Sequence, residues 1–302
     1  MMIYRSVLKL SFVIGVLFLG RPAEGQQKVL LIGIDGVRPD VLADVATPNL
    51  DRLISEGAFS DQVRTTRPTS SGPAWSSMLT GVWPEKHAVR SNNFQGNKYA
   101  TYPDFLSRIE QLRPDLVTFA AADWLPLVAE VSGGPLITGV LDSLVVRNGY
   151  MGWSEADAFI TQAAVDVLEG SDPDAMFVYL GAPDEMSHKA GSIGEEYRTA
   201  IAYSDHHVGQ LLDAIRARVS YAEEDWLILV STDHGRRADG GHGGDSPEES
   251  TIFFFAHGPS VIPGEILGTP AIVDVAVTAL THLGVQINPD WGLDGRDRAL
   301  QP

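Results

Sequence analysis

The chain has 302 residues, a formal net charge of -17, 44% hydrophobic and 20% charged residues, and no cysteine. This hydrophobic content is ordinary for a packed core and excludes an intrinsically disordered chain. The absence of cysteine excludes a disulfide scaffold and a thiolate metal site, and the negative charge argues against binding to nucleic-acid duplexes or anionic membranes.

The first 25 residues have the features of a secretory signal peptide. Arg5 and Lys9 give a basic start, residues 10–19 are apolar, and Ala23 and Gly25 are small residues at the spacing that signal peptidase requires. The apolar stretch is short for a membrane span, although an uncleaved anchor stays open as the alternative. We therefore predict a signal peptide at 1–25, a periplasmic or secreted location, and no stable membrane insertion beyond the leader.

After the leader, buried strands alternate with amphipathic segments. Residues 29–34, 176–180 and 226–230 are continuous apolar runs, which are typical of strands buried on both faces of a parallel sheet. Thr47 and Pro48 predict an N-cap and a first helical turn, in a helix that ends at Gly57. Further helices are predicted at 73–80, 102–111, 154–168 and 194–219, and further strands at 117–122, 143–147 and 251–256.

This alternation predicts an α/β fold, a doubly wound three-layer sandwich with a mostly parallel central sheet. Ser154 and Asp157 have the spacing of a capping box at the start of the helix at 154–168. No repeat or linker divides the chain. We therefore expect a single catalytic domain over residues 26–302.

The stretch from 92 to 150 is the least regular part of the sequence, and we expect it on the substrate side of the domain. It carries four large aromatic residues that could line a substrate pocket, with a place in the core or at its rim as the alternative. These residues are Phe94, Tyr99, Tyr102 and Trp124.

Carboxylates and histidines follow each of the three apolar runs. Because ligands bind outside the carboxyl ends of the strands in such sheets, we expect these side chains to meet in one crevice. They are Asp35 after the first run, Asp184 and His188 after the second, and Asp233, His234 and His242 after the third.

This combination predicts a metal site. Asp184, His188 and His242 could be the three protein ligands of a catalytic zinc, and the i, i+4 spacing puts the first two on one face of a helix. The glycines around His242 let the backbone fold back toward the turn at 233–234. The other three side chains could hold a second ion. Mixed imidazole and carboxylate ligands favour zinc, or manganese or another transition metal, over magnesium.

Three hydroxyl groups stand just before the helix expected at 73–80. Thr69, Ser70 or Ser71 could act as a nucleophile, because a helix N-terminus stabilises both an alkoxide and a phosphoryl group. A plain N-cap is the alternative role for any of them. The acids and histidines nearby favour the nucleophile.

A series of short motifs runs in order from about residue 28 to residue 297. They are Ile34-Asp35-Gly36, Thr47-Pro48-Asn49-Leu50-Asp51-Arg52-Leu53, Pro68 to Pro73, Leu79-Thr80-Gly81, Pro84-Glu85-Lys86-His87, Pro183-Asp184, His188-Lys189-Ala190-Gly191, Thr232-Asp233-His234-Gly235, Gly241-His242-Gly243-Gly244 and Asp294-Gly295-Arg296. By these motifs the chain resembles the alkaline phosphatase superfamily, and within it type I phosphodiesterase/nucleotide pyrophosphatase proteins. The resemblance implies an alkaline phosphatase-like fold and metal-dependent hydrolysis of small phosphate esters.

The resemblance also implies roles for single residues. Ser71 takes the place of the nucleophile, which forms a phosphoseryl intermediate and binds one of two divalent metal ions. The other ligands of that ion would be Asp35, Asp233 and His234, and those of the second ion Asp184, His188 and His242. Asn92 matches an asparagine that donates to a phosphoryl oxygen, with a turn-capping amide as the alternative. His87 matches a structural histidine.

The sequence departs from the diesterase pattern after Ser71, where Gly72-Pro73-Ala74-Trp75 replaces aromatic-Pro-Asn-His. The same residues partly match a sulfatase signature, but Trp75 stands at its arginine position. The alternatives are therefore a phosphomonoesterase, a phosphonate hydrolase, a sulfatase, a phosphotransferase or a catalytically silent metal-containing binding protein. The sequence does not indicate the oligomeric state. Five cationic residues could bind a substrate anion or be ordinary surface charges: Arg38, Arg67, Lys189, Arg236 and Arg237.

Overall fold

The computed structural model describes residues 25–301, and in this part of the chain eight strands form one sheet. The predicted signal peptide lies outside the described residues except for its last residue. The strands are β1 Gln26–Ile34, β2 Ala58–Arg64, β3 Thr118–Ala122, β4 Ser143–Val146, β5 Ala175–Leu180, β6 Glu224–Ser231, β7 Thr251–His257 and β8 Gly264–Glu265.

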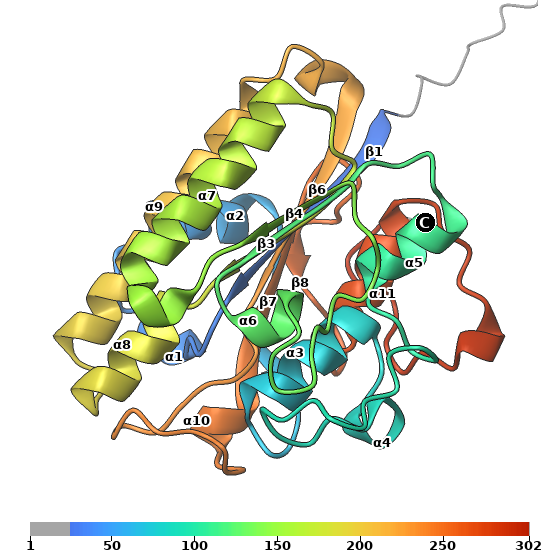
Figure 1. Cartoon of the computed structure of the whole chain (residues 1–302). Helices are drawn as coiled ribbons and strands as arrows, with labels where there is room; N and C mark the ends of the chain where they lie inside the picture. The colour runs from blue at the N-terminus through green and yellow to red at the C-terminus, as the bar shows by residue number, and fades with distance from the viewer. Residues whose placement is uncertain (1–24, 302) are drawn as a thin grey trace, which may run out of the picture.

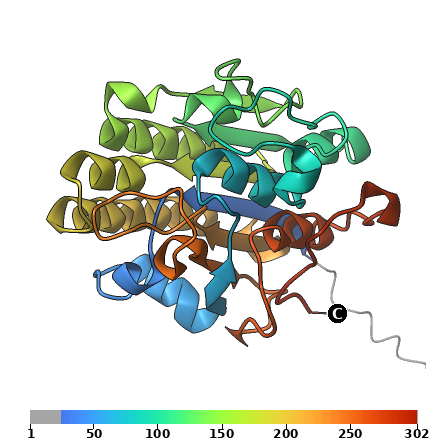
Figure 2. The same cartoon turned by 90° about the horizontal axis from the view of Figure 1, so that it is seen from below.

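The sheet is mostly parallel. Its strand order is β4-β3-β5-β1-β6-β7-β2-β8, and the five strands from β4 to β6 run parallel. β7 pairs antiparallel with both β6 and β2. Figure 2 shows β1, in dark blue, in the middle of the molecule. The predicted α/β sandwich is confirmed.

Helices cover both faces of the sheet, as Figure 1 shows. α2, α7 and α9 lie on one face, and α3, α5 and α11 lie on the other. The α-helices are α1 Pro39–Leu42, α2 Pro48–Glu56, α3 Ser71–Thr80, α4 Pro84–His87, α5 Phe105–Leu112, α6 Leu125–Val128, α7 Trp153–Gly170, α8 Ala182–Ala190, α9 Glu195–Arg216, α10 Pro247–Ser250 and α11 Asp274–His282.

The side chains of β1 explain why two hydrophobic cores form. Leu30, Ile32 and Ile34 point into the core on the α9 side, whereas Val29 and Leu31 point into the core on the α3 side. Gly33 follows on this second side, and a side chain there would overlap the Trp75 ring. The glycine therefore lets α3 pack tightly against the strand that leads to Asp35.

Two local predictions are wrong. α7 begins at Trp153 without a capping box at Ser154, because the Asp157 carboxylate accepts the backbone N–H groups of Gly181 and Ala182 at 2.8 and 3.2 Å. α5 begins at Phe105, later than expected, because the Asp104 side chain caps the N–H of Ser107 at 3.0 Å.

The aromatic residues of the stretch 92–150 are mostly core residues. Phe94, Tyr99 and Trp124 are buried, and the rings of Phe94 and Trp124 lie 5.7 Å apart. Tyr102 is half-buried. The core alternative is therefore correct for three of the four.

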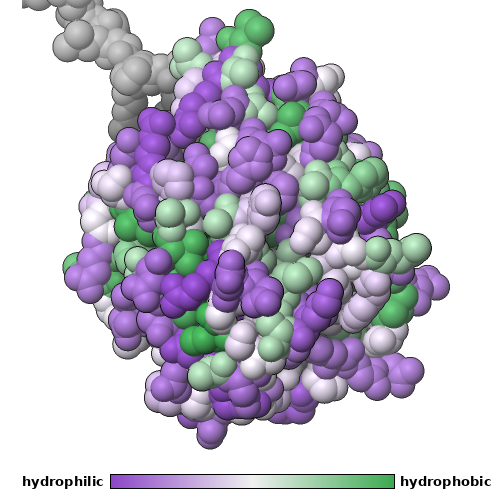
Figure 3. Space-filling model, turned by 90° about the vertical axis from the view of Figure 1, so that its left-hand side faces the viewer, coloured by the Kyte–Doolittle hydropathy of each residue, from purple (hydrophilic) through white to green (hydrophobic). Residues whose placement is uncertain are grey.

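The outer face that carries α7, α8 and α9 mixes hydrophilic and scattered hydrophobic side chains (Figure 3). Phe159 of α7 and Tyr203 of α9 are exposed hydrophobic residues of this layer. In residues 25–301, no helix combines the length and the apolar character needed to cross a bilayer.

Candidate metal centre and nucleophile

The candidate site lies at the carboxyl ends of three adjacent strands, β5, β1 and β6. Asp35 directly follows β1, Asp233 follows β6 after one intervening residue, and Asp184 lies in the first turn of α8 after β5. The predicted crevice residues therefore come together because parallel neighbouring strands end at one edge of the sheet.

Asp35, Asp233 and His234 form the first ligand group. One ligand atom of each lies within 4.8 Å of the others, and all three side chains are buried. Asp35 Oδ2 accepts hydrogen bonds from Trp75 Nε1 at 2.9 Å and Tyr179 Oη at 2.6 Å.

The other carboxylate of this group is held by the backbone. Asp233 Oδ1 accepts the N–H groups of Gly36 at 3.0 Å and His234 at 2.9 Å. Asp35 Oδ1 and Asp233 Oδ2 are buried and have no hydrogen-bond partner. Each carboxylate thus has one anchored oxygen and one free oxygen.

His234 adds a third electron-pair donor. Its Nδ1 lies 2.9 Å from the Gly235 carbonyl oxygen, to which only a protonated nitrogen can donate. Nε2 is then the unprotonated nitrogen, 3.2 Å from Asp233 Oδ2 and 3.7 Å from Asp35 Oδ1. Three buried acceptors that face one another, two of them carboxylate oxygens without a hydrogen-bond donor, suit a metal ion.

Asp184, His188 and His242 form the second ligand group, again with ligand atoms within 4.8 Å. α8 places Asp184 Oδ2 3.3 Å from His188 Nε2, which confirms the expected helical spacing. His242 Nδ1 donates to the Thr69 carbonyl oxygen at 2.8 Å, and His242 Nε2 lies 2.9 Å from His188 Nε2. Two imidazole nitrogens and a carboxylate therefore converge.

The two groups are direct neighbours. The rings of His234 and His242 are stacked with centroids 3.8 Å apart. The backbone returns as expected through the glycine run, where the N–H of Arg237 donates to the Gly241 carbonyl oxygen at 2.7 Å. The two candidate ligand groups are therefore in direct contact with each other.

Ser71 is the first residue of α3 and lies beside the first group. Its Oγ is 3.3 Å from His234 Nε2. The hydroxyl of Thr69 is engaged elsewhere, because it donates to the Gly244 carbonyl oxygen at 3.0 Å and accepts the N–H of Gly243 at 3.0 Å. Among the three candidate hydroxyls, Ser71 is therefore the one in contact with a ligand group.

Asn92 lies next to this helix N-terminus. Its Oδ1 accepts the N–H of Gly72 at 2.8 Å, so the amide group is oriented by the residue that follows Ser71. The Asn92 side chain is exposed. The structure places Asn92 beside the residue that follows Ser71, and the contact that orients its side chain is a long-range bond to the start of α3, not the cap of a local turn.

Electrostatics differ between the two groups. Burial, together with the Asp184 charge, raises the pKa of Asp35 to about 7, and burial together with Asp35 raises the pKa of Asp233 well above its usual range. Burial, together with His242, lowers the pKa of His234. Burial acts to raise the pKa of Asp184, but Arg236 and His188 outweigh it and the pKa falls. A bound divalent cation would favour ionised carboxylates and neutral imidazoles in both groups.

The sequence did not predict the contacts that three residues make with the proposed ligands. Trp75 and Tyr179 donate to Asp35, and Arg236 is a buried partner of Asp184 instead of a surface charge. Trp75 could have been predicted, since it lies four residues after Ser71 on the same helical face.

His87 was expected to be structural. Its Nε2 lies 3.0 Å from Ser77 Oγ, and its Nδ1 accepts the N–H of Val89.

Comparison with protein families gives a match over most of the described chain. A model of the type I phosphodiesterase / nucleotide pyrophosphatase family matches residues 29–141 and 145–238. Ectonucleotide pyrophosphatase/phosphodiesterase family member 7 from Mus musculus is 25% identical over 229 residues, which cover 72% of this chain and 51% of the relative. The bis(5'-adenosyl)-triphosphatase ENPP4 from Bos taurus is 27% identical over 218 residues, which cover 69% and 47%. The chain spans about half the length of these relatives.

Solved structures share the fold. A 2-O GAG sulfatase superposes with a TM-score of 0.71 at 14% identity and covers 90% of this chain and 73% of its own. Murine ectonucleotide pyrophosphatase / phosphodiesterase 5 in complex with AMP superposes with a TM-score of 0.66 at 17% identity, with 87% and 96% covered. These likenesses concern the fold.

Proposed function

The chain belongs to the type I phosphodiesterase / nucleotide pyrophosphatase family, and from this membership we propose that it hydrolyses small phosphodiesters or nucleotide pyrophosphates through a phosphoseryl intermediate on Ser71. The observation that supports the proposal most is the convergence of Ser71 Oγ with His234 Nε2 and the two unpartnered carboxylate oxygens of Asp35 and Asp233.

Two divalent ions, with zinc as the first choice and manganese or another transition metal as the alternative, would lower the pKa of the serine and stabilise the leaving oxygen. The first would be held by Asp35, Ser71, Asp233 and His234. The second would be held by Asp184, His188 and His242. Mixed nitrogen and oxygen ligands favour transition metals over magnesium.

The reaction then proceeds on the protein's own atoms. Ser71 Oγ, its proton released to solvent, attacks phosphorus in line and forms an O–P bond while the P–O bond to the leaving oxygen breaks, and the leaving oxygen takes up a proton from solvent. Water next gives its hydroxyl to phosphorus and its proton to Ser71 Oγ as the O–P bond to serine breaks. The backbone N–H of Ser71 and the Asn92 amide would contact the equatorial oxygens in both steps.

Three of the five cationic candidates are already paired with carboxylates: Arg38 with Asp40, Arg236 with Asp184 and Arg237 with Glu249. The other two, Arg67 and Lys189, are exposed and are the candidates for contact with a substrate anion.

A substrate panel tests the proposal. Metal content by elemental analysis would be measured together with kcat/KM for a bis-aryl phosphate, a mono-aryl phosphate, an aryl phosphonate and an aryl sulfate. Because one relative is a bis(5'-adenosyl)-triphosphatase, a dinucleoside triphosphate belongs in the panel. We expect bound transition metal and a preference for the diester. Absence of metal and of hydrolysis in every case contradicts the proposal, and a dominant sulfate activity assigns the protein to the sulfatases instead.

The predicted leader gives the proposal a location. We propose that the enzyme is exported and acts in the periplasm or outside the cell, with residues 26–302 as its catalytic domain. Fractionation of cells that express the full chain, with N-terminal sequencing of the product, measures both export and cleavage.

A further inference from the structure

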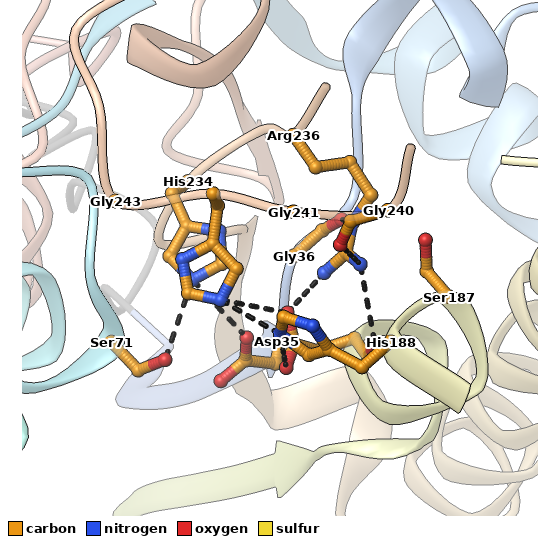
Figure 4. Close-up of polar contacts among 12 residues, drawn as sticks. Asp35, Gly36, Ser71, Ser187, His188, His234, Arg236, Gly240, Gly241 and Gly243 are labelled. Carbon is orange, nitrogen blue, oxygen red and sulfur yellow. Dashed lines mark hydrogen bonds and ion pairs between the residues drawn. The ribbon is translucent and has the colours of Figure 1, made fainter. Parts of the chain in front are cut away.

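Arg236 is fully buried beside the second ligand group, two residues after His234. Its guanidinium donates to three segments that carry proposed ligands. Nε donates to the Gly36 carbonyl oxygen at 2.9 Å, and Nη1 donates to the carbonyl oxygens of Asp184 at 3.2 Å and Gly240 at 3.0 Å. Nη2 donates to Asp184 Oδ1, so the arginine forms an ion pair with a proposed metal ligand. Figure 4 shows Arg236 beside Gly36 and Gly240.

The surroundings hold the guanidinium in this place. The ring of Tyr197 packs against it with the Arg236 Cζ 5.1 Å from the ring centroid, and Tyr197 Oη donates to the Gly36 carbonyl oxygen at 2.8 Å. Gly36 has a φ of +67°, and a side chain at this position would overlap the guanidinium. The arginine is therefore a fixed positive charge in the core.

This fixed charge makes the two ligand groups electrostatically different. The first group contains two carboxylates, Asp35 and Asp233, whose anchored oxygens accept only from neutral donors. The second group contains one carboxylate, Asp184, and that carboxylate already has a cationic partner. Two carboxylates without a cationic hydrogen-bond partner therefore face the first ion, whereas the formal charge of the single carboxylate in the second group is offset by the arginine.

Exposure differs in the same direction. The side chains of Asp35, Asp233 and His234 are at most 2% exposed, whereas those of Asp184, His242 and His188 are 10%, 11% and 40% exposed. Charge interactions are stronger where water is excluded and weaker where solvent screens them. Both charge and exposure therefore disfavour an ion in the second group.

We infer that Arg236 is a positioning residue that makes the two groups unequal: the Asp35 group binds its divalent ion tightly, and the Asp184 group binds a second ion weakly and exchanges it. The arginine fixes Asp184 so that Oδ2 faces His188, and it offsets the negative charge that would attract the ion. The inference rests on the proposed two-ion site.

Titration of the metal-free full chain with Co²⁺, followed by d–d absorption and by calorimetry, tests the inference. We expect two binding phases whose Kd values differ at least about tenfold, the size of effect that residues contacting metal ligands commonly exert. His188→Ala is expected to abolish the weaker phase, and Asp233→Asn the tighter one. Two phases of equal affinity, or the opposite assignment, overturn the inference.

Two variants of the arginine separate its charge from its position. Arg236→Gln removes the charge and is expected to bring the two Kd values within about threefold of each other, whereas Arg236→Lys keeps the charge and is expected to keep the gap. The tight phase serves as the internal control for folding in each variant. A gap that is unchanged or wider in Arg236→Gln overturns the role of the charge.

Even if a variant does not fold, the titration of the wild-type protein shows whether the two ligand groups bind cobalt with equal or unequal affinity. No cobalt binding in either phase contradicts the proposed two-ion function, whereas binding of two ions with equal affinity contradicts only the inference about Arg236. The two failures are therefore distinguishable.

Discussion

The two ends of β1, β5 and β6 both bury charged residues, but they treat them differently. At the amino ends, the buried Lys28 Nζ donates to Asp172 and Asp174 at 2.9 Å each. Both oxygens of Asp174 have partners, since Gln26 and Lys28 donate to one and the N–H of Val117 to the other.

Glu224 at the start of β6 is equally well satisfied. It accepts from Arg218 at 2.8 Å, from Ser220 at 2.6 Å and from Trp226 at 2.7 Å. At the carboxyl ends, Asp35 and Asp233 each keep one buried oxygen without a partner. Burial of charge is thus common to both ends, and the amino end also has one buried carboxylate oxygen without a partner, Asp225 Oδ1. What distinguishes the carboxyl ends is that two such oxygens, from Asp35 and Asp233, lie in one group with a histidine nitrogen.

The largest expected effect is on the nucleophile. Ser71→Ala should lower kcat for a bis-aryl phosphate by about 10⁴-fold or more in metal-loaded protein, because the covalent route is lost. Steady-state kinetics with matched metal content measures this. Ser70→Ala is the control, since Ser70 is the N-cap residue of α3 and its side chain makes no capping hydrogen bond, and the kcat of this variant should stay within a few-fold of wild type. Equal losses in both variants would refute the assignment.

Breaking the amino-end pair should affect stability without affecting chemistry. Lys28→Met leaves Asp174 buried without its cation and should lower the free energy of unfolding by about 3 kcal/mol. Urea denaturation measures the loss, and kcat of the folded variant should be unchanged. Asp172→Asn is the matched control: its side chain is 61% exposed, so a loss of less than about 1 kcal/mol is expected. A large fall in kcat for Lys28→Met would break the distinction between the two ends.

Removal of a buried charge at the carboxyl ends of the strands should stabilise the metal-free protein, whereas removal of Lys28 at the amino ends should destabilise it. Asp233→Asn removes one of two neighbouring buried acids and should raise the free energy of unfolding by about 1–2 kcal/mol. Denaturation with and without added zinc measures this, and zinc should stabilise wild type more than the variant. A metal-free variant less stable than wild type would mean that the Asp233 carboxylate is structural.

The smallest expected effect is on the pH dependence of the free energy of unfolding, through Glu224 at the amino end of β6. Burial acts to raise the pKa of Glu224, but Arg218, Ser220 and Trp226 outweigh it and lower the pKa to about 2. Because the pKa of Glu224 is lower in the folded protein, its carboxylate contributes to the free energy of unfolding at pH values above the pKa of glutamate in the unfolded chain, about 4.3. This contribution is lost as the pH falls toward 2. After allowance for solvent screening it amounts to about 1 kcal/mol.

Glu224→Gln should therefore flatten the decline in the free energy of unfolding between pH 5 and pH 2.5, measured by denaturant titration at each pH (about 1 kcal/mol in total). Glu223→Gln, at the exposed neighbouring position, should leave the decline as in wild type. Identical acid profiles for all three proteins would contradict the strong pairing of Glu224.

The sequence predicted the parts of the molecule that depend on local pattern. Continuous apolar runs predicted β1, β5 and β6, and the acids and histidines behind them predicted which side chains meet at the sheet edge. This worked because the carboxyl ends of parallel strands share an edge whatever else the fold contains.

Contacts between distant segments could not be predicted in this way. Arg236 resembled a surface charge because nothing local indicates that Asp184 and Gly36 lie against it. Asp157 resembled a helix cap, yet it binds the N–H groups at the end of β5. In each case a long-range partner outcompeted the local role of a polar side chain.

The most direct test of the account is to trap the covalent intermediate. Metal-loaded protein would be mixed with a bis-aryl phosphate, quenched in acid during turnover and digested for peptide mass spectrometry. We expect an aryl-phosphoryl adduct on Ser71 that forms and decays with turnover. Hydrolysis that proceeds with no adduct on Ser71, or with the adduct on another residue, would contradict it.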